Sequence, residues 1–174
     1  WIKNRDDVVA WRVFHIGHGG GTNPYTYGGE LDSSVIPHAS NLWFDGNPTS
    51  THITLKTSSL VNGNGKEYLA MLFASVDGIS KVGYYAGSDS EQTISCGFQP
   101  RFAIIRNISV TEDWGVYDTV RGWAAGNDKY LKLNATTAQS TYDFGQPTST
   151  GFTLVGNNTA INKAGNNFIF YAHA

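Results

Sequence analysis

The sequence contains a single cysteine, Cys96, among 174 residues. No disulfide can form within the chain, so the fold has to be stable without one. Because small secreted eukaryotic domains usually depend on disulfides, such an origin is disfavoured. Charged residues are also few, at 15% of the chain, and serine, threonine, asparagine and glycine supply much of the polarity. This composition favours strands and turns over helices.

Long apolar runs and a surplus of basic residues are absent as well. No apolar run approaches the roughly 20 residues that a membrane-spanning helix needs. The formal net charge is -2, whereas binding to nucleic-acid phosphates usually requires an excess of lysine and arginine. We therefore expect neither membrane insertion nor a nucleic-acid partner.

Motifs that carry known chemistry are missing too. There is no Walker-type loop, dinucleotide-binding fingerprint or calcium loop. HGGG at 18–21 matches the oxyanion loop of some lipases, but the sequence lacks the G-x-S-x-G nucleophile elbow that this chemistry needs. The five histidines lack metal-site spacing, so we expect surface histidines. Glu30, Asp32 and Asp45 lie close in sequence, but nothing marks them as a sugar-cleaving pair. We expect no catalytic residues, no metal and no cofactor.

What the sequence does contain is a repeated phrase, PTSTHITL at 48–55 and PTSTGFTL at 147–154. The similarity extends upstream, where WRVFH at 11–15 matches WGVYD at 114–118. Aromatic residues match aromatic residues and glycines match glycines. This pattern predicts a tandem repeat with a unit of about 100 residues.

The repeat divides the chain into two predicted domains, a first β-sandwich unit at 1–77 and a second at 78–174. Partners of residues 78–103 are missing from the first unit, so we expect it to be truncated at its N-terminus and the chain to be a piece of a longer protein. The stretch GHGGGTNPYTYGGELDSS at 17–34 is interpreted as an insertion, roughly where the second unit holds RGWAAGNDKYLKLN at 121–134.

Strand signals dominate both units, and Asn-Gly and Asp-Gly turn signals separate them. The expected strands cover 8–15, 52–57, 68–74, 80–87, 92–98, 101–110, 114–120, 129–134, 151–156 and 167–174. YLAMLFA at 68–74 and NFIFYAHA at 167–174 are nearly all apolar, which predicts central strands covered on both faces or strands buried between neighbouring domains. In KYLKLN we expect Leu131 and Leu133 to face the core. The predicted fold class is all-β, with two tandem antiparallel, jelly-roll-like β-sandwich units.

Aromatic side chains are the best candidates for contact with a ligand. Rings that recur in both units, such as Trp114, are expected in the core. Rings in or beside irregular loops could instead stack on the apolar face of a sugar, while neighbouring polar groups bind its hydroxyls. The predicted ligand-binding residues are His18, Tyr25, Tyr27 and Trp123.

Several phrases carry a resemblance to a known family. They are FAIIRN at 102–107, W-x-V-Y at 114–117, KYLKLN at 129–134, PTS-x-x-FTL at 147–154, N-x-x-G-x-x-F-x-x-Y-x-x-A at 162–174, GYYAG at 83–87 and GFQPRF at 97–102. Together they resemble a tandem repeat domain of unknown function found in virion proteins of tailed bacteriophages, especially marine phages, which are often labelled tail fibre or structural proteins. The resemblance covers nearly the whole chain, and its motifs consist of packing and turn residues.

The resemblance implies a non-enzymatic structural component on the exterior of a phage virion. The expected form is a tail fibre or tail appendage segment that attaches to a host-surface glycan. Its expected partners are other virion chains in a homo-oligomer, with a trimer favoured. Two alternatives stay open: a capsid decoration protein that holds neighbouring capsomers together, and a tail enzyme that degrades polysaccharide.

Overall fold

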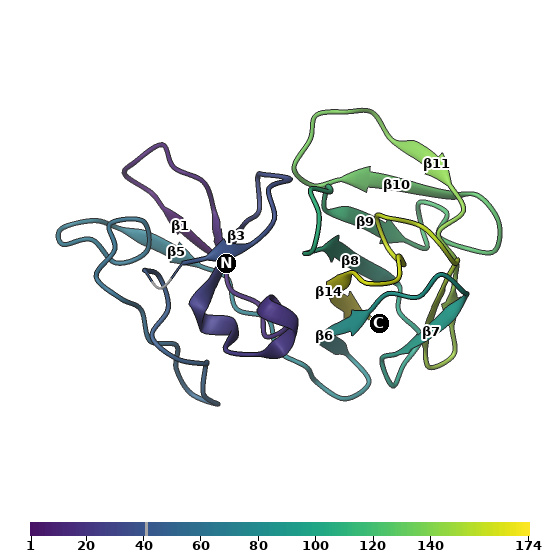
Figure 1. The fold of residues 1–174 in the computed structure, drawn as a ribbon, viewed down its shortest axis with the longest axis horizontal. Helices are drawn as coiled ribbons and strands as arrows, with labels where there is room; N and C mark the ends of the chain where they lie inside the picture. The colour runs from purple at the N-terminus through teal and green to yellow at the C-terminus, as the bar shows by residue number, and fades with distance from the viewer. Residues whose placement is uncertain (41) are drawn as a thin grey trace.

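The computed structural model describes residues 1–40 and 42–174. The chain folds into strands and turns, and every paired strand runs antiparallel to its neighbour. Figure 1 shows the N-terminal half, purple to blue, beside the C-terminal half, green to yellow. The predicted all-β fold class is therefore confirmed.

The N-terminal half is built around a five-stranded sheet in the order β4-β3-β2-β1-β5. Its strands are short: β1 (Ile2–Asn4), β2 (Arg12–Val13), β3 (Tyr27–Glu30), β4 (His38–Ala39) and β5 (Tyr68–Ala70). Two 3-10 turns, η1 (His18–Gly21) and η2 (Pro24–Thr26), connect β2 to β3. The HGGG segment forms η1, in which Gly19 and Gly20 have positive φ angles that favour glycine.

The C-terminal half is a sandwich of two sheets. A six-stranded sheet has the order β11-β10-β9-β8-β14-β6, and a three-stranded sheet has the order β12-β13-β7. The strands are β6 (Ser80–Ala86), β7 (Gln92–Ser95), β8 (Phe102–Asn107), β9 (Gly115–Asp118), β10 (Asp128–Lys132), β11 (Ser140–Tyr142), β12 (Pro147–Thr148), β13 (Gly151–Leu154) and β14 (Asn167–His173).

The two larger sheets have the same strand order, and their registers correspond. Ile2 pairs with Ala70 between β1 and β5, and Ile105 pairs with Phe170 between β8 and β14. The same correspondence holds for the other three neighbouring pairs, with sequence shifts of 102 to 103 residues. One strand breaks the match, because β6 pairs with β14, whereas no strand among residues 1–40 and 42–174 occupies that place beside β5.

The larger core lies between the six-stranded and three-stranded sheets. It is rich in rings: Tyr117 and Phe144 meet edge to face at 5.1 Å, and Phe152 and Phe170 do so at 5.5 Å. Aromatic pairs in this geometry add to the free energy gained from burying their area. The N-terminal half has a smaller cluster around Ile2, Trp43, Phe44 and Val61.

A third cluster joins the two halves. Val13 of β2 packs with Ile104, Trp114 and Ile169 on the face of the six-stranded sheet that points away from the larger core. Strands β8 and β14 are consequently covered on both faces, as the apolar pattern of NFIFYAHA predicts.

Three local predictions are wrong. YLAMLFA is not covered: Leu69 is 47% exposed and Leu72 is 70% exposed. The stretch 17–34 is not an insertion, because it contains β3, which corresponds to β10. Gly28 and Gly29 have low β-propensity, so the sequence does not predict this strand. In KYLKLN, Tyr130 packs on the core and Leu133 is exposed, since stacking with Tyr117 fixes the ring inward.

Candidate functional site

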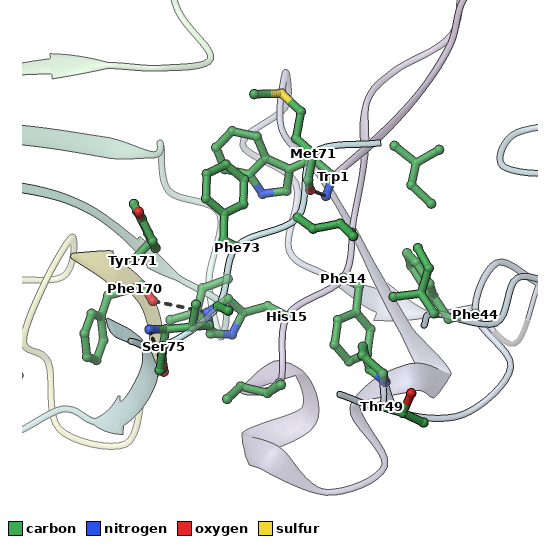
Figure 2. Close-up of a pocket in the computed structure, with 18 of the residues that line it drawn as sticks. Trp1, Phe14, His15, Phe44, Thr49, Met71, Phe73, Ser75, Phe170 and Tyr171 are labelled. Atoms are coloured by element: carbon green, nitrogen blue, oxygen red, sulfur yellow. Dashed lines mark hydrogen bonds between the residues drawn. The ribbon is translucent and has the colours of Figure 1, made fainter. Parts of the chain in front are cut away.

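A cavity with a volume of about 450 Å³ lies between the two halves. Figure 2 shows side chains that line it, with Phe14, Phe44 and Thr49 on one side and Phe170 and Tyr171 on the other. The volume lies within the range of ordinary ligand pockets, roughly 300 to 1,000 Å³. The cavity is therefore large enough to receive an external group or a peptide segment.

Two walls of the cavity are aromatic. On the N-terminal half, Phe14 follows β2 and meets Phe44 edge to face at 5.2 Å. Where the halves meet, Phe73 packs on Trp1 at 4.7 Å and on Tyr171 at 5.0 Å. These rings are held by contact with one another, so the cavity is bounded by side chains with few alternative rotamers.

The rim facing the N-terminal half carries hydroxyl groups. Thr49 Oγ1 lies 3.0 Å from Nδ1 of His52 and also bonds the backbone N–H of Thr51 and of His52. On the opposite side, Ser75 Oγ accepts a hydrogen bond from the backbone N–H of Val82 (3.0 Å). An apolar interior with a polar rim suits an extended peptide better than a sugar, because a sugar needs many hydrogen-bonding groups around its hydroxyls.

His15 closes the inner end of the cavity and is uncharged at neutral pH. Its Nδ1 accepts the backbone N–H of Gly17 (3.0 Å), so its Nε2 carries the proton and donates to the carbonyl of Phe170 (3.2 Å). Burial lowers the pKa of His15 to about 4, although the bond to Phe170 raises it in part. The side chain is thus a fixed donor that ties the N-terminal half to β14.

His18 lies deeper, fully buried between the halves. Burial first, and then the neighbouring His15 and Arg106, lower its pKa to about 3. Neither ring nitrogen has a hydrogen-bond partner in the structure. The prediction that histidines lie on the surface is wrong for His18, because the turn η1 directs it toward Gly29 in β3.

Of the four predicted ligand-binding residues, two are buried. His18 is buried as described, and Trp123 is a core ring that packs on Tyr117 at 6.0 Å. Both were predicted to lie in surface loops, which is wrong. Tyr25 in η2 and Tyr27 at the start of β3 are half-buried, and Tyr25 packs on the N-terminal cluster. The structure does not bring Trp123 together with the other three, because it belongs to the core of the other half.

The acidic residues considered for sugar cleavage are dispersed. Glu30 forms an ion pair with Arg12, whose guanidinium stacks over Trp43 at 4.6 Å. Asp32 and Asp45 are exposed. Trp43 is a core residue, and its ring fills the space that a side chain at position 28 would need, which explains a glycine in the middle of β3.

A second cavity, of about 80 Å³, contains an acidic pair that sequence reasoning missed. Burial raises the pKa of Glu112, whereas the hydrogen bond from Lys132 lowers the pKa of Asp113. The two shifts are opposed, as in many acid–base sites. The volume is that of roughly two or three water molecules, which is too small for a sugar ring.

A buried polar contact that joins the halves was also missed. Arg106 is fully buried, and its guanidinium donates to three backbone carbonyls of the N-terminal half, those of Glu30, Ser33 (2.6 Å) and Val35. It also stacks over Trp114 at 4.7 Å. Burial lowers the pKa of Arg106 to about 10, so the group stays charged at neutral pH.

In the part of the chain that the structure describes, no cluster of three or more His, Cys, Asp or Glu side chains is placed to hold a metal ion. The same residues include no helix with the length and apolar character needed to cross a bilayer.

Comparison with known proteins gives one match. A family model described as "Domain of unknown function (DUF7483)" matches residues 1–174. No curated protein and no solved structure matches the chain.

Proposed function

We propose that this chain, which belongs to the DUF7483 family, is a structural β-module of a phage virion, built from two copies of one unit and forming part of a tail fibre or tail appendage. The observation that carries the proposal is the matched register of the two larger sheets. Duplicated units of one fold extend an appendage without a new fold for each segment. The resemblance to virion repeat domains supports the same role.

The contacts between the halves support a stiff segment. Arg106 and Trp114 of the second half both donate to the carbonyl of Glu30 in the first, Trp114 through its indole N–H (3.0 Å). Val13 and Ile169, both fully buried, pack in the same region. The hydrogen bonds and the apolar packing together resist bending between the two halves, which suits a fibre that transmits force.

Attachment to a host-surface glycan belongs to the proposal, with Tyr25 and Tyr27 as the remaining candidates. A homotrimeric assembly, which the resemblance implies, would place three copies of each contact on one fibre. Linked sites bind at high effective concentration, so weak contacts add up.

The experiment is to locate the chain in purified particles of the phage that encodes it. We expect its peptides in the digested particle, and a labelled Fab against the chain on the tail. A label on the head would favour the capsid decoration role. Absence from the particle would contradict both.

An enzymatic role is tested separately. The purified chain is incubated with host capsule and lipopolysaccharide, and reducing ends are measured. Release of reducing ends that is lost in Glu112→Gln would replace the structural proposal with a polysaccharide-degrading enzyme. No release is expected.

A further inference from the structure

Among the described residues, the outer edge of β5 is unpaired, whereas the equivalent edge of β14 in the second half is paired with β6. Its counterpart β14 lies between β8 and β6, but β5 has β1 as its one neighbour in the described part of the chain. The backbone N–H of Met71 donates to the carbonyl of Trp1 (2.9 Å) on the β1 side. Since bonding directions alternate along an antiparallel strand, Tyr68 and Ala70 direct their backbone N–H and C=O groups outward.

The side chains along this edge have the composition of a covered strand. Leu69, Leu72 and Phe73 are 47%, 70% and 38% exposed, respectively. In β14, the corresponding segment is apolar for a clear reason, because it is paired on both edges and covered on both faces. An unpaired strand with apolar exposed residues is usually a site for addition of another strand.

The cavity adjoins this edge and corresponds to space that β6 and β7 fill in the second half. There, Tyr85 of β6 stacks on Phe168 at 5.1 Å, and Phe152 of β13 pairs with Ile94 of β7. The residue that matches Phe152 in the repeat is Ile53, which lines the cavity. Ile53 thus lines the cavity at a position whose counterpart in the second half is covered by β7.

Within the described chain, Asn62 lacks the contacts that its counterpart Asn162 makes with the β6–β7 connection. Asn162 is buried: its Oδ1 accepts the backbone N–H of Ser88 (2.7 Å), and its Nδ2 donates to the carbonyl of Ser90 (2.9 Å). These bonds fasten the β6–β7 connection to the unit. The matching Asn62, which sits in a turn with the same backbone hydrogen bonds, is exposed.

We propose that the free edge of β5 and the adjoining cavity receive a strand segment with the sequence character of residues 78–103, supplied by the same polypeptide ahead of Trp1. In the second half, β6 and β7 directly precede β8. The equivalent segment therefore reaches β5 from directly before β1, and Trp1 itself lines the cavity. The mode is β-augmentation, in which backbone pairing supplies affinity and side-chain pockets supply register. The inference does not depend on where the chain lies in a virion.

The test is an extended chain in which residues 78–103 are repeated directly ahead of Trp1. This junction keeps the natural register, because Ala103 is followed by Ile104, the counterpart of Trp1, in the second half. We expect the thermal midpoint to rise by about 5 °C or more. The amides of Tyr68 and Ala70 should also exchange more slowly. The control carries the same added residues in scrambled order; a rise of equal size there, or no rise in either, would overturn the proposal.

Asn62 gives a second readout. In the extended chain, Asn62→Ala should remove most of the gain in thermal midpoint, because the amide is then buried against the added segment. In the unextended chain the same substitution should change the midpoint by less than about 1 °C, as expected for an exposed side chain. Equal effects in both backgrounds would contradict the assigned position of the added segment.

A third readout does not depend on folding of the extended chain. A fluorescent peptide of residues 78–103 is titrated onto the unextended chain and followed by anisotropy. Saturable binding that Leu72→Lys abolishes supports the proposal, and no binding overturns it. Sedimentation of the unextended chain decides the source: a concentration-dependent dimer that protects Tyr68 and Ala70 would make a second copy the occupant and overturn the assignment to the same polypeptide.

Discussion

Asn4 and Asn107 hold the same position in the two halves and share the same three hydrogen bonds. The Oδ1 atom of Asn4 accepts the backbone N–H groups of Asp6 (2.9 Å) and Asp7 (3.0 Å), and its Nδ2 donates to the carbonyl of Ser59 (3.1 Å). Both asparagines are buried. The side chain thus closes the turn after the strand and anchors it to a distant loop.

The bonds of Asn107 are equivalent. Its Oδ1 accepts the backbone N–H groups of Ser109 (2.8 Å) and Val110 (3.3 Å), and its Nδ2 donates to the carbonyl of Thr159 (2.6 Å). Asn4→Ala and Asn107→Ala should each lower the free energy of unfolding by about 2–4 kcal/mol, because buried backbone groups lose their partners. Urea unfolding measures both. The exposed Asn127 provides the control, since Asn127→Ala should change little; a loss confined to one of the buried pair would contradict their equivalence.

Arg106→Ala should separate the two halves energetically. The substitution leaves the carbonyls of Ser33 and Val35 without a donor and exposes one face of Trp114. We expect the free energy of unfolding to fall by about 3–5 kcal/mol, as when one partner of another buried charged contact is removed. Arg106→Lys should recover little, because an ammonium cannot reproduce the planar fork. Arg101 is exposed, and a similar loss on Arg101→Ala would show that the effect is not specific to the contact between the halves.

Stability should fall as the pH drops from 6.5 toward 4. The pKa values of His15 and His18 are lowered to about 4 and about 3 in the folded state. Between those values and about 6.5 the unfolded chain binds protons that the folded chain does not, so unfolding becomes more favourable. For the fully buried His18 the loss between pH 7.5 and pH 5 is about 2 kcal/mol. His15 is partly exposed and should contribute less.

His18→Leu tests this assignment. The ring nitrogens of His18 have no partners in the structure, so an apolar side chain of similar size loses no hydrogen bond. The variant should be at least as stable as the parent near pH 5 and should show a shallower pH dependence in urea unfolding. His52→Leu is the control, because His52 is exposed. An unchanged pH profile in His18→Leu would contradict the assignment.

Trp114→Ala should lower the free energy of unfolding by about 3–5 kcal/mol, because it empties a large buried volume and removes the hydrogen bond to Glu30. Trp114→Phe should recover the packing but leave the carbonyl of Glu30 with one donor fewer, for a loss of about 1–2 kcal/mol. Thermal and urea unfolding measure both. Equal losses would show that packing makes no separate contribution.

The sequence predicts the strands whose pattern is strong and misses those whose pattern is disguised. Residues 80–87 contain a valine and two adjacent tyrosines, and residues 167–174 are mostly apolar and aromatic; the two segments form β6 and β14. Strand β3 reads YGGE, and nothing in its propensity marks a strand; it forms because neighbours on both sides pair with it. HITLKT at 52–57 has the alternation of a strand but forms only an isolated bridge, between Leu55 and Phe44.

The candidate site was harder to predict than the fold. An aromatic ring in an irregular loop predicts an exposed side chain, but Trp123 lies in the core because the turn that carries it folds back onto Tyr117. The cavity is lined by residues from both halves, such as Phe14 and Tyr171. A local sequence pattern does not predict which residues far apart in the chain lie side by side. The sequence contains one useful signal, because the apolar run at 68–74 predicts a covered strand. In the structure Leu72 is exposed, which identifies this strand as the one that lacks a neighbour on its outer edge in the described part of the chain.

The central claim is that the two halves are copies of one β-unit, of which the first, as far as the structure describes it, lacks the strand that corresponds to β6. The most direct test is residue-resolved hydrogen exchange on the unextended chain at low concentration. The account predicts that the amides of Tyr68 and Ala70 exchange at least about 100-fold faster than those of Phe168 and Phe170, their counterparts in β14, whose outer edge is paired with β6. Equal protection at the two pairs of positions would contradict it.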